Sequence, residues 1–399
     1  MKKSFLLLTG AFLFFTSAVI GQFLEAPALQ HYFDFSAEDT NKILFDFFDD
    51  NFIKDTEYFG PIASGMTLLG DDINAQLGWV PDKHILILGG VFARKDYGTP
   101  GFEILQPTWT VKLQDNKGIS FLIGNIEGAM DHRYIQPIFQ SLFPVSYYQE
   151  PYQNPLETGG QLKIDKPWLW FDLWINWQHQ EYLNSDYHEH ILQGASADLT
   201  LLHPNDVLKI SLPLQYTFFH YGGQLDTAHT PYETIYNGAA GLKFNFDFSK
   251  NSSFIKDVML EGYACAYKDL SRVSDIQLPY ISGNGEYVNV DIKTKYGFGI
   301  DGSFWNGSDW VAPLGLDLYQ SVSWVYKSYS EDSRKLIFLR LYYQKELLPN
   351  LYVDLRLEPY TDLNLKLTEY AYYIFLTYKR TFTLAKVHLP KFNDNAYSH

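Results

Sequence analysis

Three histidines near the middle of the chain have a spacing that suits metal binding. His188 and His190 alternate in "YHEH" (187–190), so an extended strand would place both imidazoles on one face. His179 precedes them by a short segment and could supply a third ligand. Imidazole nitrogen is a common ligand of zinc and copper. The pattern predicts a metal site formed by His179, His188 and His190; the alternative is that they are unligated surface histidines.

Nucleophilic catalysis finds little support. Ser196 and Ser211 lie on the polar side of alternating stretches, but neither belongs to a GxSxG pattern, and the chain has no HExxH. The single cysteine, Cys265, excludes an intrachain disulfide and any CxxC motif. We therefore expect no catalytic residue, no cofactor and no enzyme activity. A hydrolase with its site at an outer rim is the weaker alternative.

The elements that must position these side chains are β-strands, because apolar residues alternate with polar ones over long stretches. In "LWFDLWINWQ" (169–178) the odd positions are apolar and the even positions are mixed. This period of two recurs along most of the chain and predicts about sixteen strands, with 14 or 18 left open. Among the predicted strands are 61–69, 72–79, 292–305 and 314–326.

Three features favour a membrane barrel over a soluble sandwich. The alternating segments are about 10 or more residues long, the length of a tilted membrane strand. Their polar faces carry charged residues in mid-strand, which a watery interior can hydrate and a sealed core could not. Short links such as "VPDKH" (80–84) alternate with long ones such as 129–155. We predict an all-β, closed antiparallel transmembrane barrel with short periplasmic turns and longer extracellular loops.

The N-terminus predicts export. "MKKSFLLLTGAFLFFTSAVIGQ" begins with two lysines, continues with an apolar stretch and ends in small residues, the layout of a signal peptide over residues 1–21. We expect a periplasmic or plug segment at 22–58, the barrel at 59–382 and a polar tail at 383–399. The formal charge of −15 argues against a nucleic-acid partner.

The inner face of the predicted barrel carries charges of both signs, which implies weak charge selectivity for small hydrophilic solutes. A barrel of about sixteen strands is wide enough for an aqueous channel. The alternative role for the inward tryptophans is a track for sugars. The predicted lumen residues are Lys112, Lys163, Trp170, Asp172, Trp174, Asn176, Asp198, Lys209, Gln215, Lys243, Asp247, Asp301, Arg340, Asp354, Arg356 and Glu358.

The longest predicted loop, 129–155, is rich in aromatic residues. Phe139, Phe143, Tyr147 and Tyr148 could fold inward and constrict the pore, or remain outside as a contact surface. The first arrangement suits a diffusion channel, and the second suits a surface binding or assembly protein. The sequence leaves both open and slightly favours the constriction.

The chain resembles outer-membrane β-barrel proteins of Gram-negative bacteria, most closely porin-like barrels of Bacteroidota of about this length. The resemblance rests on "EYFGPIASGMTLLG" (57–70), "GGVFARKDYG" (89–98), "GNIEGAMDHRYIQP" (124–137) and "ETGGQ" (157–161). It implies an outer-membrane location, contact with outer-membrane lipid, insertion by the barrel-assembly machinery and a possible homo-oligomer. Such barrels usually end on an aromatic residue, whereas here a polar tail follows Phe382.

Overall fold

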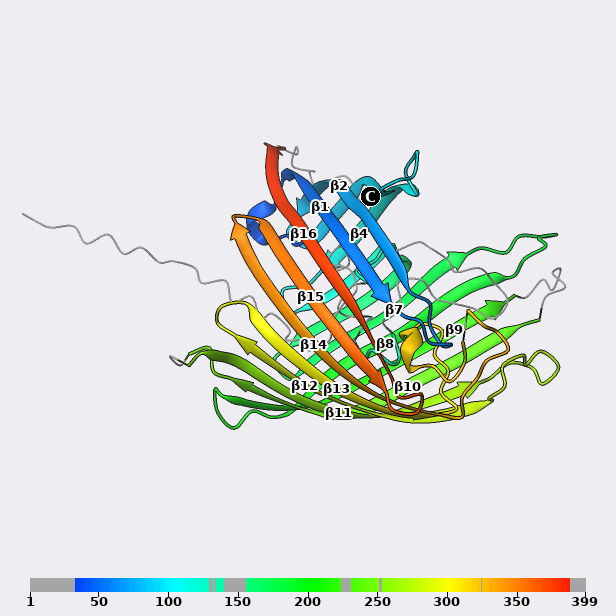
Figure 1. Ribbon diagram of the computed structural model, residues 1–399. Coiled ribbons are helices and arrows are strands. Elements are labelled where there is room, and N and C mark those ends of the chain that lie inside the picture. The colour runs from blue at the N-terminus through cyan, green and yellow to red at the C-terminus, as the bar shows by residue number, and fades with distance from the viewer. Residues whose placement is uncertain are drawn as a thin grey trace, which may run out of the picture.

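A computed structural model describes residues 33–128, 132, 134–139, 156–223, 231–250, 253–323 and 325–387. Most of them belong to sixteen antiparallel strands that form one closed barrel, so the predicted fold class is confirmed (Figure 1). The strands are β1 (Lys42–Glu57), β2 (Met66–Asp82), β3 (Ile85–Asp96), β4 (Ile104–Gln114), β5 (Ile119–Asn125), β6 (Thr158–Lys166), β7 (Leu169–His179), β8 (Glu189–Leu202), β9 (Leu208–Gly222), β10 (Glu233–Asp247), β11 (Ile255–Asp269), β12 (Ser282–Thr294), β13 (Phe298–Ser308), β14 (Ser333–Leu348), β15 (Leu351–Asp362) and β16 (Leu367–Lys386).

The barrel closes by pairing its first strand with its last. β1 pairs with β2 on one side and with β16 on the other, and both ladders run over nearly the whole of β1. Closure leaves no strand edge unpaired, as a sheet surrounded by lipid requires. The described residues also contain two short 3-10 helices, η2 (Ala37–Asp39) and η3 (Asp317–Tyr319). Within the described residues, no helix has the length and apolar character needed to cross a membrane.

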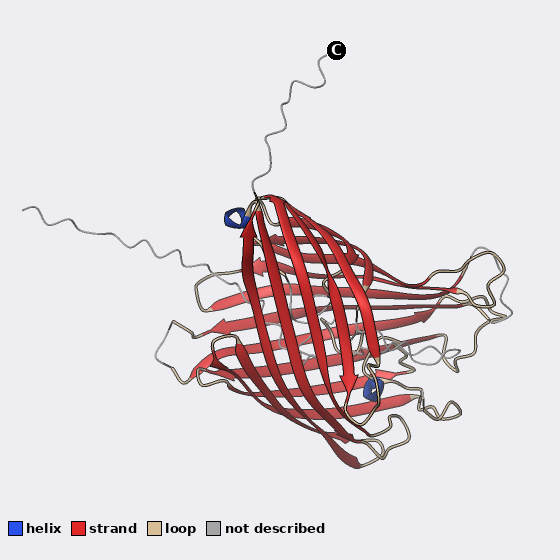
Figure 2. Ribbon diagram, turned by 90° about the horizontal axis from the view of Figure 1, so that it is seen from above, coloured by secondary structure: helices blue, strands red, loops and turns tan. Residues whose placement is uncertain are grey.

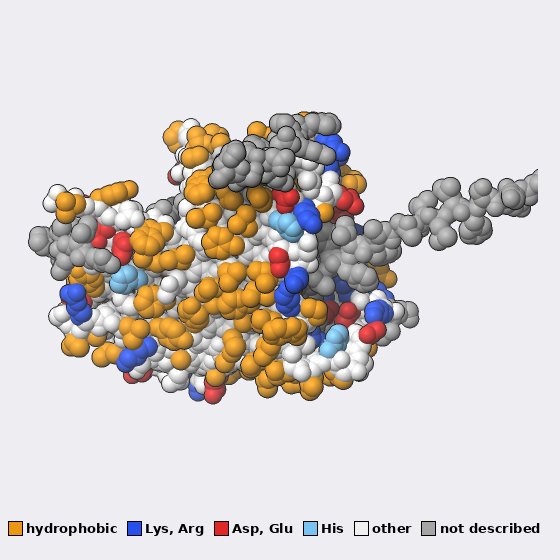
Figure 3. Space-filling model, turned by 180° about the vertical axis from the view of Figure 1, so that it is seen from behind, with side chains coloured by type: hydrophobic (Ala, Val, Ile, Leu, Met, Phe, Trp, Pro, Cys, Tyr) orange, Lys and Arg blue, Asp and Glu red, His pale blue; other side chains and the backbone are white. Residues whose placement is uncertain are grey.

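Each strand separates an apolar outer face from a mixed inner face. On β7, Leu173 and Trp177 are exposed outside, whereas Asp172 and Trp174 are buried inside. Apolar side chains spread over the outer wall in the space-filling view (Figure 3). The period-two alternation produces both faces at once, because successive side chains of a strand point to opposite sides.

The connections at the two ends of the barrel differ in length. Short turns such as 83–84, 167–168 and 349–350 lie at the end that also holds the start of β1 and the end of β16. Longer loops gather at the opposite end (Figure 2). We assign the short turns to the periplasm, following the habit of outer-membrane barrels. Two of the long loops matter below: loop 3 (126–157) and loop 7 (309–332).

The predicted strand number is correct, but four individual assignments differ. The predicted strands 61–69 and 72–79 fall largely in the single strand β2, and 314–326 belongs to loop 7. The sequence prediction missed β1 and β12, and its strand 292–305 spans the turn between β12 and β13. The predicted total is therefore correct because the errors cancel: two strands were missed, one strand was counted twice, and one predicted strand belongs to a loop.

The predicted segment boundaries also change. The non-barrel segment 22–58 was wrong for residues 42–57, which form β1, and the barrel continues past Phe382 to Lys386. β1 escaped detection because "FDFFDDNF" carries carboxylates on both faces of the strand, which obscures the alternation. The proposed signal peptide and most of the tail lie outside the described residues.

The chain enters the barrel from inside its periplasmic end. Phe33 and Phe35 pack with Leu44, Val80, Leu86 and Leu88 on the inner faces of β1 to β3. Gln114 at the end of β4 donates a hydrogen bond of 3.3 Å to the Phe35 carbonyl. The few residues before β1 therefore line part of the periplasmic opening.

Candidate functional site

The described parts of two extracellular loops fold inward and fill part of the barrel interior. We call the described part of loop 3 (His132 and 134–139), together with residues 310–323 of loop 7, the plug. It packs with aromatic residues of the inner wall into one apolar cluster that reaches from β5 round to β15. Burial of this surface stabilises the inward position of both loops. The most deeply buried apolar residues of the plug are Ile135, Ile138, Trp310, Val311, Ala312 and Tyr319.

Gln136 joins the two loops to each other and to the wall. Its side-chain oxygen accepts hydrogen bonds from Arg340 Nη2 at 2.7 Å, Tyr319 at 2.7 Å and Tyr287 at 3.2 Å. These residues come from β14, loop 7 and β12. All four side chains are buried, so their polar atoms have little access to water. A single amide oxygen thus connects three separate parts of the barrel.

Arg340 is itself fixed by the wall. Its Nη1 lies 2.8 Å from Asp301 on the neighbouring strand and donates to Ser303 at 2.8 Å, while its Nε lies 3.5 Å from Glu358. The guanidinium also lies over the ring of Phe338, 4.6 Å from its centroid. A buried arginine needs such compensation. The wall therefore presents a positioned donor to the plug.

A second attachment connects loop 3 to the opposite wall. Tyr134 donates a hydrogen bond of 2.8 Å to Asp198 on β8, and Lys243 on β10 contacts both Asp198 and the Tyr134 hydroxyl. The Ile135 amide donates to Gln215 on β9 at 2.8 Å. Loop 3 is therefore held from β8 to β14 by polar contacts across the lumen.

His132 forms the third attachment, which we call the latch. Its Nδ1 lies 3.0 Å from Glu157 Oε2 at the end of loop 3, and its Nε2 lies 3.0 Å from Asp172 Oδ2 on β7. The ring stacks on Trp174 with centroids 4.0 Å apart. Burial alone would lower the pKa of His132, but the charges of Glu157 and Asp172 outweigh it and raise the pKa to about 9. The latch is therefore a buried imidazolium between two carboxylates.

Loop 3 begins with another compact ionic group. Glu127 accepts from Lys112 on β4 and Lys163 on β6, each at 2.6 Å. Burial opposes the charge of Glu127, but the two ammonium groups outweigh it and lower its pKa to about 2. Gln161 donates both to the Glu127 carbonyl and to Asp172, which joins this group to the latch.

Loop 7 is shaped by its own hydrogen bonds and by one tryptophan of the wall. The side-chain oxygen of Gln320 accepts from the Ala312 amide at 2.7 Å and closes the loop on itself. Trp305 on β13 donates to the Tyr319 carbonyl at 3.2 Å. The indole ring lies against Gly285 and Gly307, where any side chain would clash with it. Glycine at these positions lets the ring lie flat on the wall below the loop.

Inner side chains become more exposed toward the periplasmic turns. The side chain of Lys209 is 41% exposed and that of Lys293 is 28% exposed, although both strands are otherwise tightly packed inside. Gln344 and Asp247, close to the same end, are exposed. The described plug therefore occupies the extracellular and middle parts of the lumen. The inner side chains of the periplasmic part are more exposed.

The structure places the predicted lumen residues in three groups. Trp174, Asp198, Gln215, Lys243, Asp172 and Arg340 contact the plug. Lys112, Asn176, Asp301, Asp354, Arg356 and Glu358 bind neighbours on the wall or at the start of loop 3. Lys163, Trp170, Lys209 and Asp247 are partly or fully exposed.

The inward tryptophans do not form an open track. Trp174 is buried between His132 and Phe139, and Trp170 packs against Tyr134 at 5.4 Å between ring centroids. Phe139 is thus a buried loop residue that packs on the inner wall, and its predicted role in a constriction stays a prediction. Phe143, Tyr147 and Tyr148 lie outside the described residues.

The three histidines proposed as metal ligands stack instead on aromatic rings. His179 stacks on Tyr187 at 4.1 Å, His188 on Tyr232 at 4.6 Å, and His190 meets Tyr221 edge-on at 4.6 Å. Over the described ranges, no group of three histidine, cysteine, aspartate or glutamate side chains is arranged to hold a metal ion. The geometry thus argues against the predicted metal site, because each ring serves in packing.

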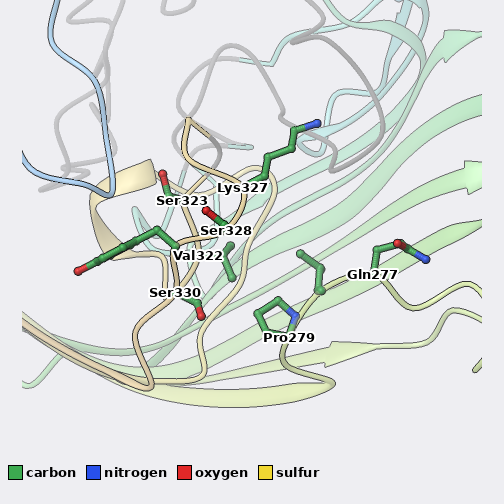
Figure 4. A pocket seen from close by; sticks show the side chains of 9 residues that line it. Gln277, Pro279, Val322, Ser323, Lys327, Ser328 and Ser330 are labelled. Carbon is green, nitrogen blue, oxygen red and sulfur yellow. The ribbon is translucent and has the colours of Figure 1, made fainter.

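A small pocket opens on the extracellular side, next to the plug. It has a volume of about 190 Å³ and lies between loop 7 and the loop that joins β11 to β12, with Leu278, Pro279 and Val322 as its apolar part (Figure 4). Ser323, Ser328 and Ser330 supply hydroxyl groups around it. The pocket borders residues that lead directly into the plug.

One polar group lies on the outer wall, where lipid is expected. Asp71 on β2 lies close to Asp49 on β1, and both project to the same side as the exposed Leu69 and Leu77. Tyr97 at the end of β3 donates to the adjacent Asn51 at 3.0 Å. Acidic residues are costly on a lipid-facing wall, so this pair is unusual for its place.

The sequence did not reveal the residues that organise the plug. Gln136, Glu157 and Tyr319 come from loops, where no periodicity marks a side chain as buried. In "WVAPLGLDLYQSVSW" (310–324) the apolar content was interpreted as a strand, although two glycine or proline residues interrupt it. High apolar content inside a predicted extracellular loop was the available signal for an inward fold.

The comparisons with known proteins agree on the barrel. The family model described as "Lipid A 3'-O-deacylase-type" matches residues 35–387, which is most of the chain. No curated protein matches the sequence significantly. The likeness to the Bacteroidota barrels expected from the sequence motifs receives no support from these comparisons.

Two solved structures have a similar fold at low sequence identity. The outer membrane protein OprD from Pseudomonas aeruginosa has a TM-score of 0.50 and 9% identity, covering 88% of this chain and 96% of that one. A loop L8 deletion mutant of OmpT, an outer membrane protein of Vibrio cholerae, has a TM-score of 0.51 and 10% identity, covering 85% and 99%. These likenesses show the architecture.

Proposed function

We propose that this chain, which belongs to the lipid A 3'-O-deacylase-type family, is a gated porin-like channel for small hydrophilic solutes. One observation carries the proposal: the plug meets the wall through hydrogen bonds and ion pairs set across a lumen lined with charges. A barrel of this strand number is wide enough for water once its loops move aside. The plug is then the closed state of a gate.

The contacts between plug and wall are polar, which favours a plug that can move over one that closes the barrel permanently. Gln136, Tyr134 and His132 reach the wall through groups that water can replace when the loops move outward. Charges of both signs on the wall, such as Arg340, Asp301 and Asp198, suit a weakly selective path. A homo-oligomer remains a prediction of the same function.

Conductance of the purified protein in planar bilayers tests the channel. We expect small and infrequent openings for the natural protein, and larger, longer openings after deletion of 133–150. Swelling of reconstituted liposomes in sugar solutions would measure the size limit. A deletion variant that folds and inserts, yet forms no pore, would reject the channel.

The family name and the outer wall favour one second candidate, hydrolysis of an ester in lipid A. Such a substrate lies in the outer leaflet, so its enzyme needs polar groups on the lipid-facing side of the barrel. Asp49 and Asp71 lie there, and two neighbouring carboxyl groups can supply a general acid and a general base. The sequence analysis expected no enzyme, and this pair was not among its candidates.

Mass spectrometry of lipid A decides between the two candidates. Cells producing the protein would release one acyl chain if it is a hydrolase, and Asp71→Asn would abolish the release. Leu77→Ala, on the same outer face, is the matched control. Unchanged lipid A in cells that contain the folded barrel would exclude this activity and leave the channel.

A further inference from the structure

The latch differs from the other plug contacts because its ionisation can change near neutral pH. Both ring nitrogens of His132 face carboxylate oxygens at 3.0 Å, one from Glu157 and one from Asp172. A neutral imidazole carries only one N–H, so only the imidazolium can present a proton to both oxygens. Two carboxylate oxygens at this distance stabilise the imidazolium relative to the neutral ring.

The surroundings of the ring reinforce this assignment. The Trp174 indole lies nearly parallel to the ring, at 18° between planes, and its face favours a cation. Phe139 also lies near both rings, with its centroid 6.3 Å from that of His132. His132 is fully buried, so no water compensates a change in its charge. Loss of its proton would leave two carboxylates facing each other across a neutral ring.

The other groups near the latch do not replace that proton. From β6, Gln161 contacts both Asp172 and His132 and carries no charge, and from β9 Gln215 binds the His132 carbonyl. Lys163 on β6 pairs in register with Asp172 but directs its ammonium group to Glu127, as does Lys112 on β4. His132 is therefore the titratable cation held between the two carboxylates.

We propose that protonation of His132 regulates the gate: the latch holds loop 3 in the lumen while the imidazolium is present, and alkaline pH releases it. This regulation rests on the proposed channel function. A histidine that gains carboxylate partners in the closed state stabilises that state at pH below its ordinary value, and the stabilisation is lost as pH rises through the raised value. Closure is thus favoured at neutral and mildly acidic pH.

The test is conductance as a function of pH between 6 and 10, in natural protein and in His132→Gln. We expect open probability to rise with pH in the natural protein. The total rise should be roughly tenfold for each unit by which the carboxylates raise the pKa of His132 in the closed state. In His132→Gln the gate should be open more often at pH 7 and should not respond to pH. His203→Gln, an exposed histidine in a periplasmic turn, is the matched control and should keep the natural profile.

The two carboxylates supply an internal check. Glu157→Gln removes one charge beside the ring, so the midpoint of the pH response should move down by about one unit or more while a response remains. Tryptophan fluorescence gives a second readout, because deprotonation of His132 should change the emission of Trp174 and Trp174→Phe should remove that change. This signal does not depend on a pore.

The outcomes separate the regulation from the channel. A pH response that persists in His132→Gln would overturn the latch as its source. A pore that conducts equally at every pH would reject the regulation and leave the channel standing. Absence of any pore in all variants, including the 133–150 deletion, would reject the channel itself.

Discussion

Arg340 in the barrel wall donates a hydrogen bond of 2.7 Å to Gln136, a loop residue that precedes it by 204 positions. The bond fixes the described part of loop 3 against the wall formed by β14. Gln136→Ala would leave the Arg340, Tyr319 and Tyr287 donors without their shared acceptor. Because a buried donor without a partner costs about 1–3 kcal/mol, we expect the plug to loosen and the open probability to rise about tenfold or more.

Single-channel recording measures this effect at fixed pH. Gln277→Ala, which lies at the extracellular pocket and away from Arg340, is the control and should behave like the natural protein. Equal open probabilities for the two variants would show that Gln136 does not hold the plug.

Gly128 makes room for the latch. A Cβ at this position would overlap the Glu157 carboxylate that binds His132, so Gly128→Ala must displace that side chain. We expect this variant to open at neutral pH as His132→Gln does. Gly89→Ala is the control, because a Cβ there meets nothing within 4 Å. The latch would be unimportant for closure if both alanine variants stayed closed at pH 7.

Gly285 supports the ring of Trp305, and its substitution should affect stability more than gating. An added Cβ would overlap the indole, which lies under loop 7 and cannot move far in a packed interior. We expect Gly285→Ala to lower the free energy of unfolding by about 1–3 kcal/mol. Urea unfolding in detergent, followed by gel mobility, measures it.

The matched control for this substitution is Gly302→Ala on the neighbouring strand. Its Cβ would project into open space, so the unfolding curve should stay within about 0.5 kcal/mol of the natural protein. Identical curves for both variants would mean that the wall adapts around Trp305.

The sequence predicted the barrel well because alternation is a local signal that reports directly on two faces. Leu173 and Trp177 were assigned to the lipid face and Asp172 to the interior, and the structure places them so. β1 was missed because Asp49 and Asp50 put carboxylates on both faces and removed the contrast on which the assignment depends. Asp49 is also half of the outward acidic pair, so the unpredicted strand carries one of the candidate sites.

The plug could not be predicted by the same means. Gln136 and Arg340 meet only after the sixteen strands have closed into a barrel. The local sequence around either residue does not predict this contact. His132 lies within the predicted extracellular loop 129–155, where no alternation indicates which side chains are buried. Its burial depends on loop 3 turning inward, which follows from long-range packing and not from periodicity.

The ionic group at the start of loop 3 should make the stability of the folded protein depend on pH in the acid range. Burial raises the cost of charging Glu127, yet Lys112 and Lys163 outweigh it, and its pKa falls to about 2 in the folded protein. A lowered pKa stabilises the folded state fully above the ordinary value of about 4.5, and this contribution is lost as pH falls toward 2. We expect the melting temperature of the natural protein to drop over that interval. In Glu127→Gln this component should be missing, while Glu38→Gln, exposed before β1, should retain it. Parallel acid profiles for Glu127→Gln and the natural protein would show that the two lysines do not hold the loop through this carboxylate.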